Sequence, residues 1–327
     1  MIRDRVGVAS AALPTEPDDF TDAGQRHQAE PNPANRIRSI LIATDANEIA
    51  ANAVRAGLAL RDLLDARAEL LSVLPSRLLP VAPIYPGFVA AEIDTGEQPR
   101  RERRMADVLA QLELVRGSAQ GATVTVRVGD PALTIVRTAV ERDAQLIALG
   151  LRQHSTLDRL FRDQTALRVM RLSPVAVLAV TPLLATVPRR ILVGMDFSRA
   201  SVRVARTAAQ LLPTGGTLLV AHAQPDAGPA SSETEGAHLI YARGISASFA
   251  RLRHDLGMPR DVHIEPVILH GPAAPELLSL ADRSAADVIA VGSHRRPALD
   301  RVLLGSVTAA IARAARCSML VVAEPEV

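Results

Sequence analysis

Several residue types with well-known roles are scarce in this chain of 327 residues. It has no lysine and no tryptophan, only two tyrosines and five phenylalanines, and a single cysteine, Cys317. One cysteine excludes an internal disulfide framework and a metal site built from several cysteines. So few aromatic rings argue against a surface that stacks nucleic-acid bases. The net charge of +2 gives no reason to expect a polyanionic partner. We therefore expect no nucleic-acid partner.

Long hydrophobic runs are also missing. The longest apolar stretch, residues 175–187, is interrupted by Thr181 and Pro182 and is too short to span a bilayer as one helix. The first residues do not form a convincing export signal. We therefore expect a cytoplasmic protein without a membrane partner. Residues 1–36 are polar and proline-dotted, which predicts a flexible N-terminal tail.

The remainder of the chain contains a tandem repeat. Four short motifs occur twice in the same order, at offsets between 142 and 151 residues. The paired segments are 39–45 and 190–196, 128–132 and 270–274, 145–150 and 287–292, and 174–180 and 318–322. One ancestral unit with loops of different length accounts for these changing offsets.

Each unit alternates continuous apolar runs with helix-like patterns. Such runs are typical of parallel strands buried on both faces. The predicted strands are 38–44, 68–73, 122–128, 144–149 and 174–180 in the first unit, and 190–195, 216–222, 262–268, 287–292 and 318–323 in the second. The predicted helices of the second unit are 199–213, 232–256, 273–284 and 304–315.

This alternation predicts two tandem doubly wound α/β domains, over residues 37–182 and 189–327, each with a five-stranded parallel sheet. The connector, residues 181–188, is short, so we expect the domains to pack closely.

Doubly wound sheets bind ligands at the carboxyl ends of their strands. Asp45 and Asp196 each follow the first strand of a unit, and Gly292 ends the fourth strand of the second. Gly305 and Ser306 then open a helix. A glycine and a hydroxyl residue at a helix start present free backbone N–H groups and the positive end of the helix dipole, which favours an anion such as phosphate. In a plainer interpretation, each aspartate only caps the helix that follows it.

These motifs resemble the universal stress protein family in its tandem two-domain form. The resemblance rests on Asp196-Phe-Ser, Leu218-Leu-Val-Ala-His, Gly292-Ser-His and Leu303-Leu-Gly-Ser-Val, and it covers about 38–181 and 189–324. It implies a Rossmann-like fold of the adenine-nucleotide α-hydrolase group. It also implies a dimer-like pairing of residues 174–180 with 318–323 inside one chain, with homodimers of the whole chain left open.

By the same resemblance, the second domain binds ATP, with or without Mg²⁺. The implied binding residues are Asp196, Ala223, Gly292, His294, Arg295, Gly305, Ser306 and Val307. ATP-binding members carry glycine where this chain has Arg295. That arginine either costs the backbone its close approach to phosphate or offers a forked cation to it.

The first domain departs further from the pattern, because Asp163 and Gln164 stand where glycine and serine are expected. A carboxylate there repels phosphate, so we expect this domain to be a structural partner with a degenerate nucleotide site.

Two functions follow. The leading hypothesis is a non-catalytic, ATP-binding regulator of a stress response that acts on an unidentified protein partner. The alternative is a nucleotide-independent interaction scaffold. We find no catalytic pattern and no metal-ligand spacing, so at most a weak ATPase activity is expected. The cluster 99–104 is interpreted as a solvated helix face with internal Glu–Arg pairs. Residues 75–99 are interpreted as a lid over the first pocket, an interaction loop or a plain surface excursion.

Overall fold

The computed structural model describes most of the chain from residue 36 onward. The described residues are 36–76, 96–116, 123–151, 164–224, 244–245, 247–250, 252, 256, 261–293 and 305–323. The predicted tail, except Arg36, lies outside them, as do residues 77–95 and much of the predicted helix 232–256.

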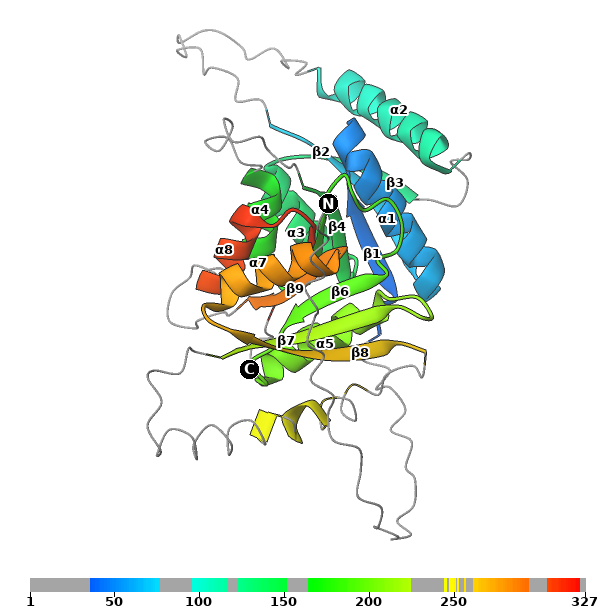
Figure 1. The fold of residues 1–327 in the computed structure, drawn as a ribbon. Coiled ribbons are helices and arrows are strands. Elements are labelled where there is room, and N and C mark those ends of the chain that lie inside the picture. The colour runs from blue at the N-terminus through cyan, green and yellow to red at the C-terminus, as the bar shows by residue number, and fades with distance from the viewer. Residues whose placement is uncertain are drawn as a thin grey trace, which may run out of the picture. The chain divides into compact units, whose positions relative to one another are not determined.

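Strands and helices alternate along both halves (Figure 1). The N-terminal half contains β1 (Ser39–Ala43), α1 (Glu48–Leu64), β2 (Arg67–Leu74), α2 (Glu97–Arg116), β3 (Thr123–Val128), α3 (Pro131–Glu141), β4 (Leu146–Gly150), α4 (Gln164–Leu172) and β5 (Ala176–Val180). The C-terminal half contains β6 (Arg190–Gly194), α5 (Arg199–Gln210), β7 (Thr217–Gln224), β8 (His263–His270), α7 (Ala273–Ser284), β9 (Val288–Ser293), α8 (Ser306–Ala314) and β10 (Ser318–Ala323). Every strand predicted from the sequence is present within three residues of its expected ends.

The ten strands form one sheet in the order β3-β2-β1-β4-β5-β10-β9-β6-β7-β8. Within each half, neighbouring strands are parallel. The halves meet where β5 pairs with β10 in the antiparallel direction, with Leu178 opposite Leu320. The predicted pairing of the fifth strands is therefore confirmed, and it produces two five-stranded halves related as in a dimer.

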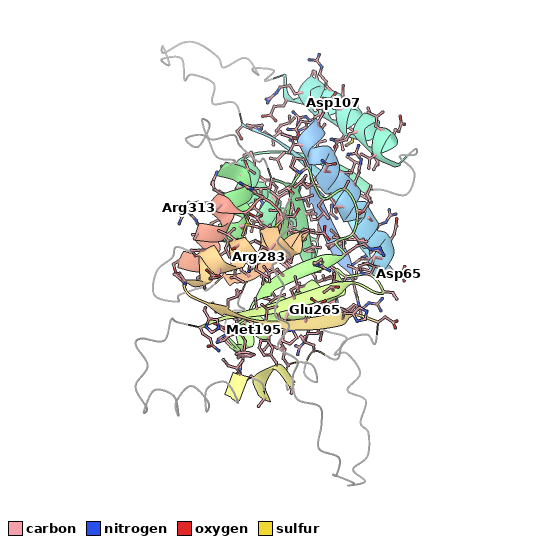
Figure 2. All side chains as sticks on the ribbon, in the orientation of Figure 1. Asp65, Asp107, Met195, Glu265, Arg283 and Arg313 are labelled. Carbon is pink, nitrogen blue, oxygen red and sulfur yellow. The ribbon has the colours of Figure 1, made fainter. Side chains whose placement is uncertain are left out.

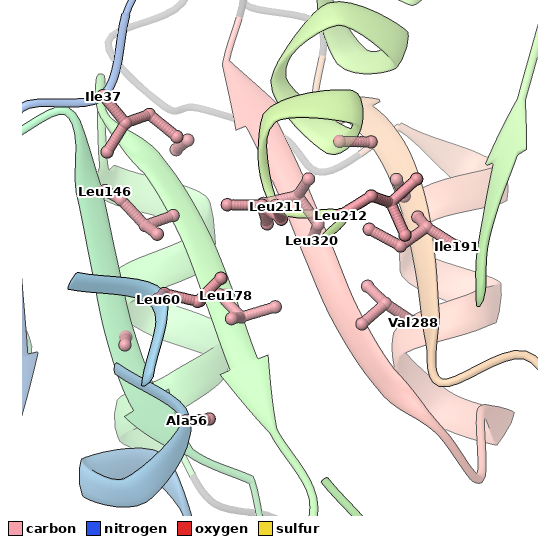
Figure 3. Close-up of a cluster of buried hydrophobic side chains, with 14 of the residues drawn as sticks. Ile37, Ala56, Leu60, Leu146, Leu178, Ile191, Leu211, Leu212, Val288 and Leu320 are labelled. Atoms are coloured by element: carbon pink, nitrogen blue, oxygen red, sulfur yellow. The ribbon is translucent and has the colours of Figure 1, made fainter. Parts of the chain in front are cut away.

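Two hydrophobic layers, one on each face of the sheet, run across this seam. One layer contains Leu178 and Leu320 (Figure 3) and packs beneath α1, α2 and α5. The other contains Val177 and Met319 and packs beneath α3, α4, α7 and α8. Because both layers are continuous between the halves, burial of apolar surface holds the domains together. The expectation of close packing is confirmed.

Polar contacts also join the two halves. The buried Thr181, directly after β5, donates its backbone N–H to Ser318 Oγ at 3.0 Å. The N–H of Ile37 donates to Gln210 Oε1, at the end of α5, at 2.9 Å. Charged residues such as Asp107 on α2 and Arg313 on α8 lie on the outer surfaces of their helices (Figure 2). No helix in the described part of the chain is both long and apolar enough to cross a membrane.

Candidate functional site

A cavity of about 260 Å³ lies at the carboxyl ends of β6, β7 and β9 and reaches the start of α8. We call it the C-terminal cavity. It brings together six of the eight residues expected to bind ATP: Asp196, Ala223, Gly292, Gly305, Ser306 and Val307. The other two, His294 and Arg295, lie outside the described residues. Segments more than 100 residues apart in the sequence thus line one cavity, as the doubly wound topology requires.

Asp196 shapes the turn between β6 and α5. Its Oδ1 accepts the backbone N–H of Ser198 at 2.9 Å. Ser198 is the N-cap of α5 and accepts the N–H of Ser201 at 3.2 Å. The interpretation of Asp196 as the helix cap is therefore wrong, because Ser198 has that role. Asp196 instead holds the turn two residues earlier and faces the cavity.

Aromatic side chains pack together at this turn. Phe197, between Asp196 and Ser198, has φ +61°, which is a strained conformation for a residue with a side chain. Its ring lies 5.0 Å from that of His222 and 5.1 Å from that of Phe249. Nδ1 of His222 is 2.7 Å from the Met195 carbonyl, and since a carbonyl only accepts, Nδ1 carries the proton. We call Phe197, His222 and Phe249 the aromatic cluster.

The start of α8 forms the opposite wall. Its N-cap is Gly305, and no side chain among the described residues caps this helix. The N–H groups of the first turn are therefore left for a ligand or for water. Thr308 donates its hydroxyl to the Gly292 carbonyl at 2.6 Å. This bond fixes the helix start against the end of β9, so Gly292 and Gly305 border the same space.

The N-terminal half has a matching cavity of about 320 Å³, which we call the N-terminal cavity. The residues that line it include Thr44, Asp45, Asn47, Arg104, Ile135, Leu149, Gly150 and Thr165. Its turn repeats the other one. Asp45 Oδ1 accepts the N–H of Asn47 at 3.3 Å, Asn47 caps α1, and Ala46 has φ +63°. Capping by Asp45 is therefore wrong as well.

At the N-terminal turn, hydrogen bonds from side chains of α2 stand where the C-terminal turn has the aromatic cluster. Arg104 donates through Nη1 to the Asp45 carbonyl at 3.0 Å and to Ser72 Oγ at 3.4 Å. Gln111 donates to the Asn47 carbonyl at 2.8 Å and accepts from the Thr44 hydroxyl at 2.7 Å. An ion pair is present on this helix, with Arg101 3.9 Å from Glu97, but its acid lies outside the cluster 99–104, and Glu102 inside the cluster accepts from Gln98 at 2.9 Å. Arg104, however, was missed as a cavity residue, because nothing in its local pattern separates it from its solvated neighbours.

Two titratable groups near the sheet ends have shifted pKa values. The hydrogen bond from Arg168, at 2.7 Å, lowers the pKa of Asp130, which also caps α3. Burial raises the pKa of the Cys317 thiol to about 11, so it stays protonated and unreactive near neutral pH. Among the described residues, no group of three or more His, Cys, Asp and Glu side chains is arranged to hold a metal ion.

Comparison with known proteins decides the family. Residues 36–181 and 188–323 both match the universal stress protein family. The chain belongs to this family. A crystal structure of a universal stress protein from Archaeoglobus fulgidus DSM 4304 is similar over 89% of this chain and 99% of its own, with 18% identity and a TM-score of 0.60. A functionally unknown protein from Pseudomonas aeruginosa PAO1 is similar over 90% of this chain and 95% of its own, with 17% identity and a TM-score of 0.59.

At these identities the likeness to solved structures shows the fold alone. A universal stress protein of Methanocaldococcus jannaschii is 37% identical over 65 residues, which is 20% of this chain and 38% of that protein. The expected resemblance is thus confirmed at the level of family and fold. This universal stress protein carries two family domains in tandem, paired through β5 and β10 as a pseudo-dimer.

Proposed function

We propose that this universal stress protein is a non-catalytic sensor that holds ATP in the C-terminal cavity. The main support is the uncapped start of α8 beside Gly292, which together form one wall of the cavity. Free N–H groups at a helix start, reinforced by the helix dipole, are a common phosphate site. A glycine next to them lets phosphate oxygens approach the backbone closely.

The rest of the cavity suits a nucleoside. Ala221, Leu277 and Val291 give it an apolar side, and Asp196 gives it a carboxylate that can accept hydrogen bonds from ribose hydroxyls. Its volume of about 260 Å³, measured over the described residues, lies just below the roughly 300–1,000 Å³ usual for ligand pockets. An amphipathic ligand with an apolar ring and a polyanionic tail matches these opposite walls. Mg²⁺, where present, would neutralise part of the phosphate charge.

As a sensor, the protein would respond to ATP by a change in the surface around the cavity mouth. The ligand can shift the protein only as far as it binds one conformation better than another. A protein partner that contacts the surface near Gly292 and Gly305 would then distinguish the occupied from the empty form.

A negative charge introduced at Ser306 tests whether ATP phosphates bind at the start of α8. Ser306→Glu places a carboxylate at the start of α8, where it complements the helix dipole and should keep or raise stability by about 0.3–1 kcal/mol. The same carboxylate repels a triphosphate, so ATP affinity should fall at least about tenfold, equivalent to about 1.4 kcal/mol. Ser306→Gln has the same size without the charge and is the matched control.

Isothermal titration calorimetry of the full chain measures the ATP affinity of each variant, and urea unfolding measures its stability. We expect wild type and Ser306→Gln to bind ATP and Ser306→Glu to bind it much more weakly. Wild type that takes up no ATP at millimolar concentration, or Ser306→Glu that binds as wild type does, would overturn the proposal.

The seam between the domains favours a second candidate function. Both hydrophobic layers continue from one half into the other, so the tandem pair is held together as one unit, with one outer surface, whatever the cavities hold. A nucleotide-independent scaffold would use that surface for docking. It predicts the same partner binding with and without ATP, whereas the sensor predicts a difference.

A further inference from the structure

Arg104 gives the N-terminal cavity a guanidinium, and no arginine is among the described residues that line the C-terminal cavity. We propose that this cavity binds a small organic anion, a carboxylate or a phosphate monoester, through the guanidinium of Arg104, and that it does not bind ATP. The inference concerns a separate site and does not depend on ATP binding in the C-terminal half.

The first support is the state of the guanidinium. Its Nη1 is engaged by the Asp45 carbonyl and Ser72, which orient the group at the cavity wall. Within the described residues, its Nε and Nη2 have no hydrogen-bond partner and it forms no ion pair. Arginine has five N–H donors in a fixed fork that matches carboxylate and phosphate oxygens. The structure thus presents an oriented cation with unused donors.

The second support is the exchange of side chains between the halves. Ser39 pairs with Arg67 in the N-terminal half, and Arg190 pairs with Thr217 in the C-terminal half. By this register, Ser72 occupies the position of His222, and Ala46 occupies that of Phe197. Two of the three rings of the aromatic cluster, those of His222 and Phe197, are therefore replaced by a hydroxymethyl and a methyl group. Removal of this bulk leaves room for the guanidinium beneath the turn.

The third support is the balance of charge, which selects the size of the ligand. Asp45 also lines the cavity, with its two carboxylate oxygens accepting from the N–H and Nδ2 of Asn47 at 3.3 and 2.8 Å. One cation beside one carboxylate suits a ligand with a single anionic group and disfavours a triphosphate. Ile135 and Leu149 supply an apolar wall for a short carbon chain.

Chemical-shift mapping on the unmodified full chain tests the site directly. The probes are inorganic phosphate and propionate, with propionamide as the uncharged control. We expect phosphate, propionate or both to shift the amide signals of Gly150 and Thr165 while propionamide does not, and the active probe identifies the preferred anion. Shifts confined to Gly292 and Val307, equal shifts with propionamide, or no shifts with either anion would overturn the proposal.

A pair of variants then tests the role of Arg104. Arg104→Gln should weaken binding of the active anion by about tenfold or more, the usual effect of losing a hydrogen bond to a charged group. Arg103→Gln removes the same charge from an exposed neighbour on α2 that does not line the cavity, and it should bind as wild type does. Equal affinities in the two variants would contradict the proposal. Circular dichroism checks that both variants are folded. If Arg104→Gln does not fold, the chemical-shift mapping on wild type still tests the site.

Discussion

The two halves of this universal stress protein share a backbone design and differ in the side chains that support it. Both place an aspartate after the first strand, a residue with φ near +60° after the aspartate, and a separate N-cap two positions on. Beneath the turn, the C-terminal half has the aromatic cluster and the N-terminal half has Arg104. The turn therefore belongs to the fold, while the side chains that contact it differ between the halves.

A substitution at the seam between β5 and β10 tests whether the two halves unfold independently. Leu320 is fully buried between them, and Leu320→Ala should lower the free energy of unfolding by about 2–5 kcal/mol. Because the hydrophobic layers are shared, we expect one cooperative transition in urea, followed by circular dichroism, that moves as a whole. Leu114→Ala, at a side chain that is 86% exposed, is the control and should change stability by less than about 0.5 kcal/mol. Two resolved transitions, only one of them shifted, would show that the halves unfold independently.

Replacing the left-handed residue of each turn, Ala46 or Phe197, by glycine should change the stability of the protein in opposite directions. A non-glycine residue in the left-handed region costs about 1–2 kcal/mol, and glycine removes that strain at an entropic cost of about 0.5–1 kcal/mol. Ala46→Gly should therefore stabilise the protein by up to about 1 kcal/mol. Phe197→Gly should destabilise it, because each lost ring contact is worth about 0.5–1.5 kcal/mol beyond the area buried.

Urea titration of both variants measures the difference. Ala285→Gly, at another left-handed alanine that ends α7, is the control and should behave as Ala46→Gly does. Equal losses of stability in Phe197→Gly and Ala46→Gly would remove the distinction that we draw between the turns.

The smallest expected change in stability comes from the N-caps of α3 and α7, the corresponding helices of the two halves. Asp130 caps α3 by accepting the N–H of Leu133 at 2.9 Å, whereas its counterpart Pro272 makes no side-chain cap of α7. Asp130→Ala should cost about 1 kcal/mol at neutral pH, most of it from the cap, since the pair with Arg168 is largely exposed. Pro272→Asp should add a cap and raise stability by a similar or smaller amount.

The pH dependence of this effect has a defined sign. Because Arg168 lowers the pKa of Asp130 in the folded state, the stabilisation is present above the ordinary aspartate pKa of about 3.9 and is lost as the pH falls through the lower folded value. The stability difference between wild type and Asp130→Ala should be constant from about pH 5 to 8 and shrink below about pH 4. A difference that grows on acidification would contradict this assignment.

Periodic apolar runs were sufficient to predict most of the fold. Residues 273–284 were expected as a helix and form α7 with those ends, and the strands at the seam were placed to within two residues. Such elements are predictable because burial of both sheet faces imposes a continuous apolar pattern. Gly292 and Gly305, expected from their places after the fourth strand and before the fourth helix, both line the C-terminal cavity.

Contacts made at long range were not predictable in this way. Arg104 reaches Asp45 across 59 residues, and its neighbours on α2 have the same composition without the same role. The plainer interpretation gave the caps to Asp45 and Asp196, whereas Asn47 and Ser198 perform them. Aspartate, asparagine and serine are about equally good N-caps, so only geometry separates them.

The central claim is that one shared fold holds ATP in its C-terminal half alone. Equilibrium dialysis of the full chain with labelled ATP, with wild type compared with Asp196→Ala and Asp45→Ala, tests it most directly. We predict one ATP per chain at saturation, weakened in Asp196→Ala and unchanged in Asp45→Ala. Two ATP per chain, none, or a single one whose affinity depends on Asp45 would contradict the account.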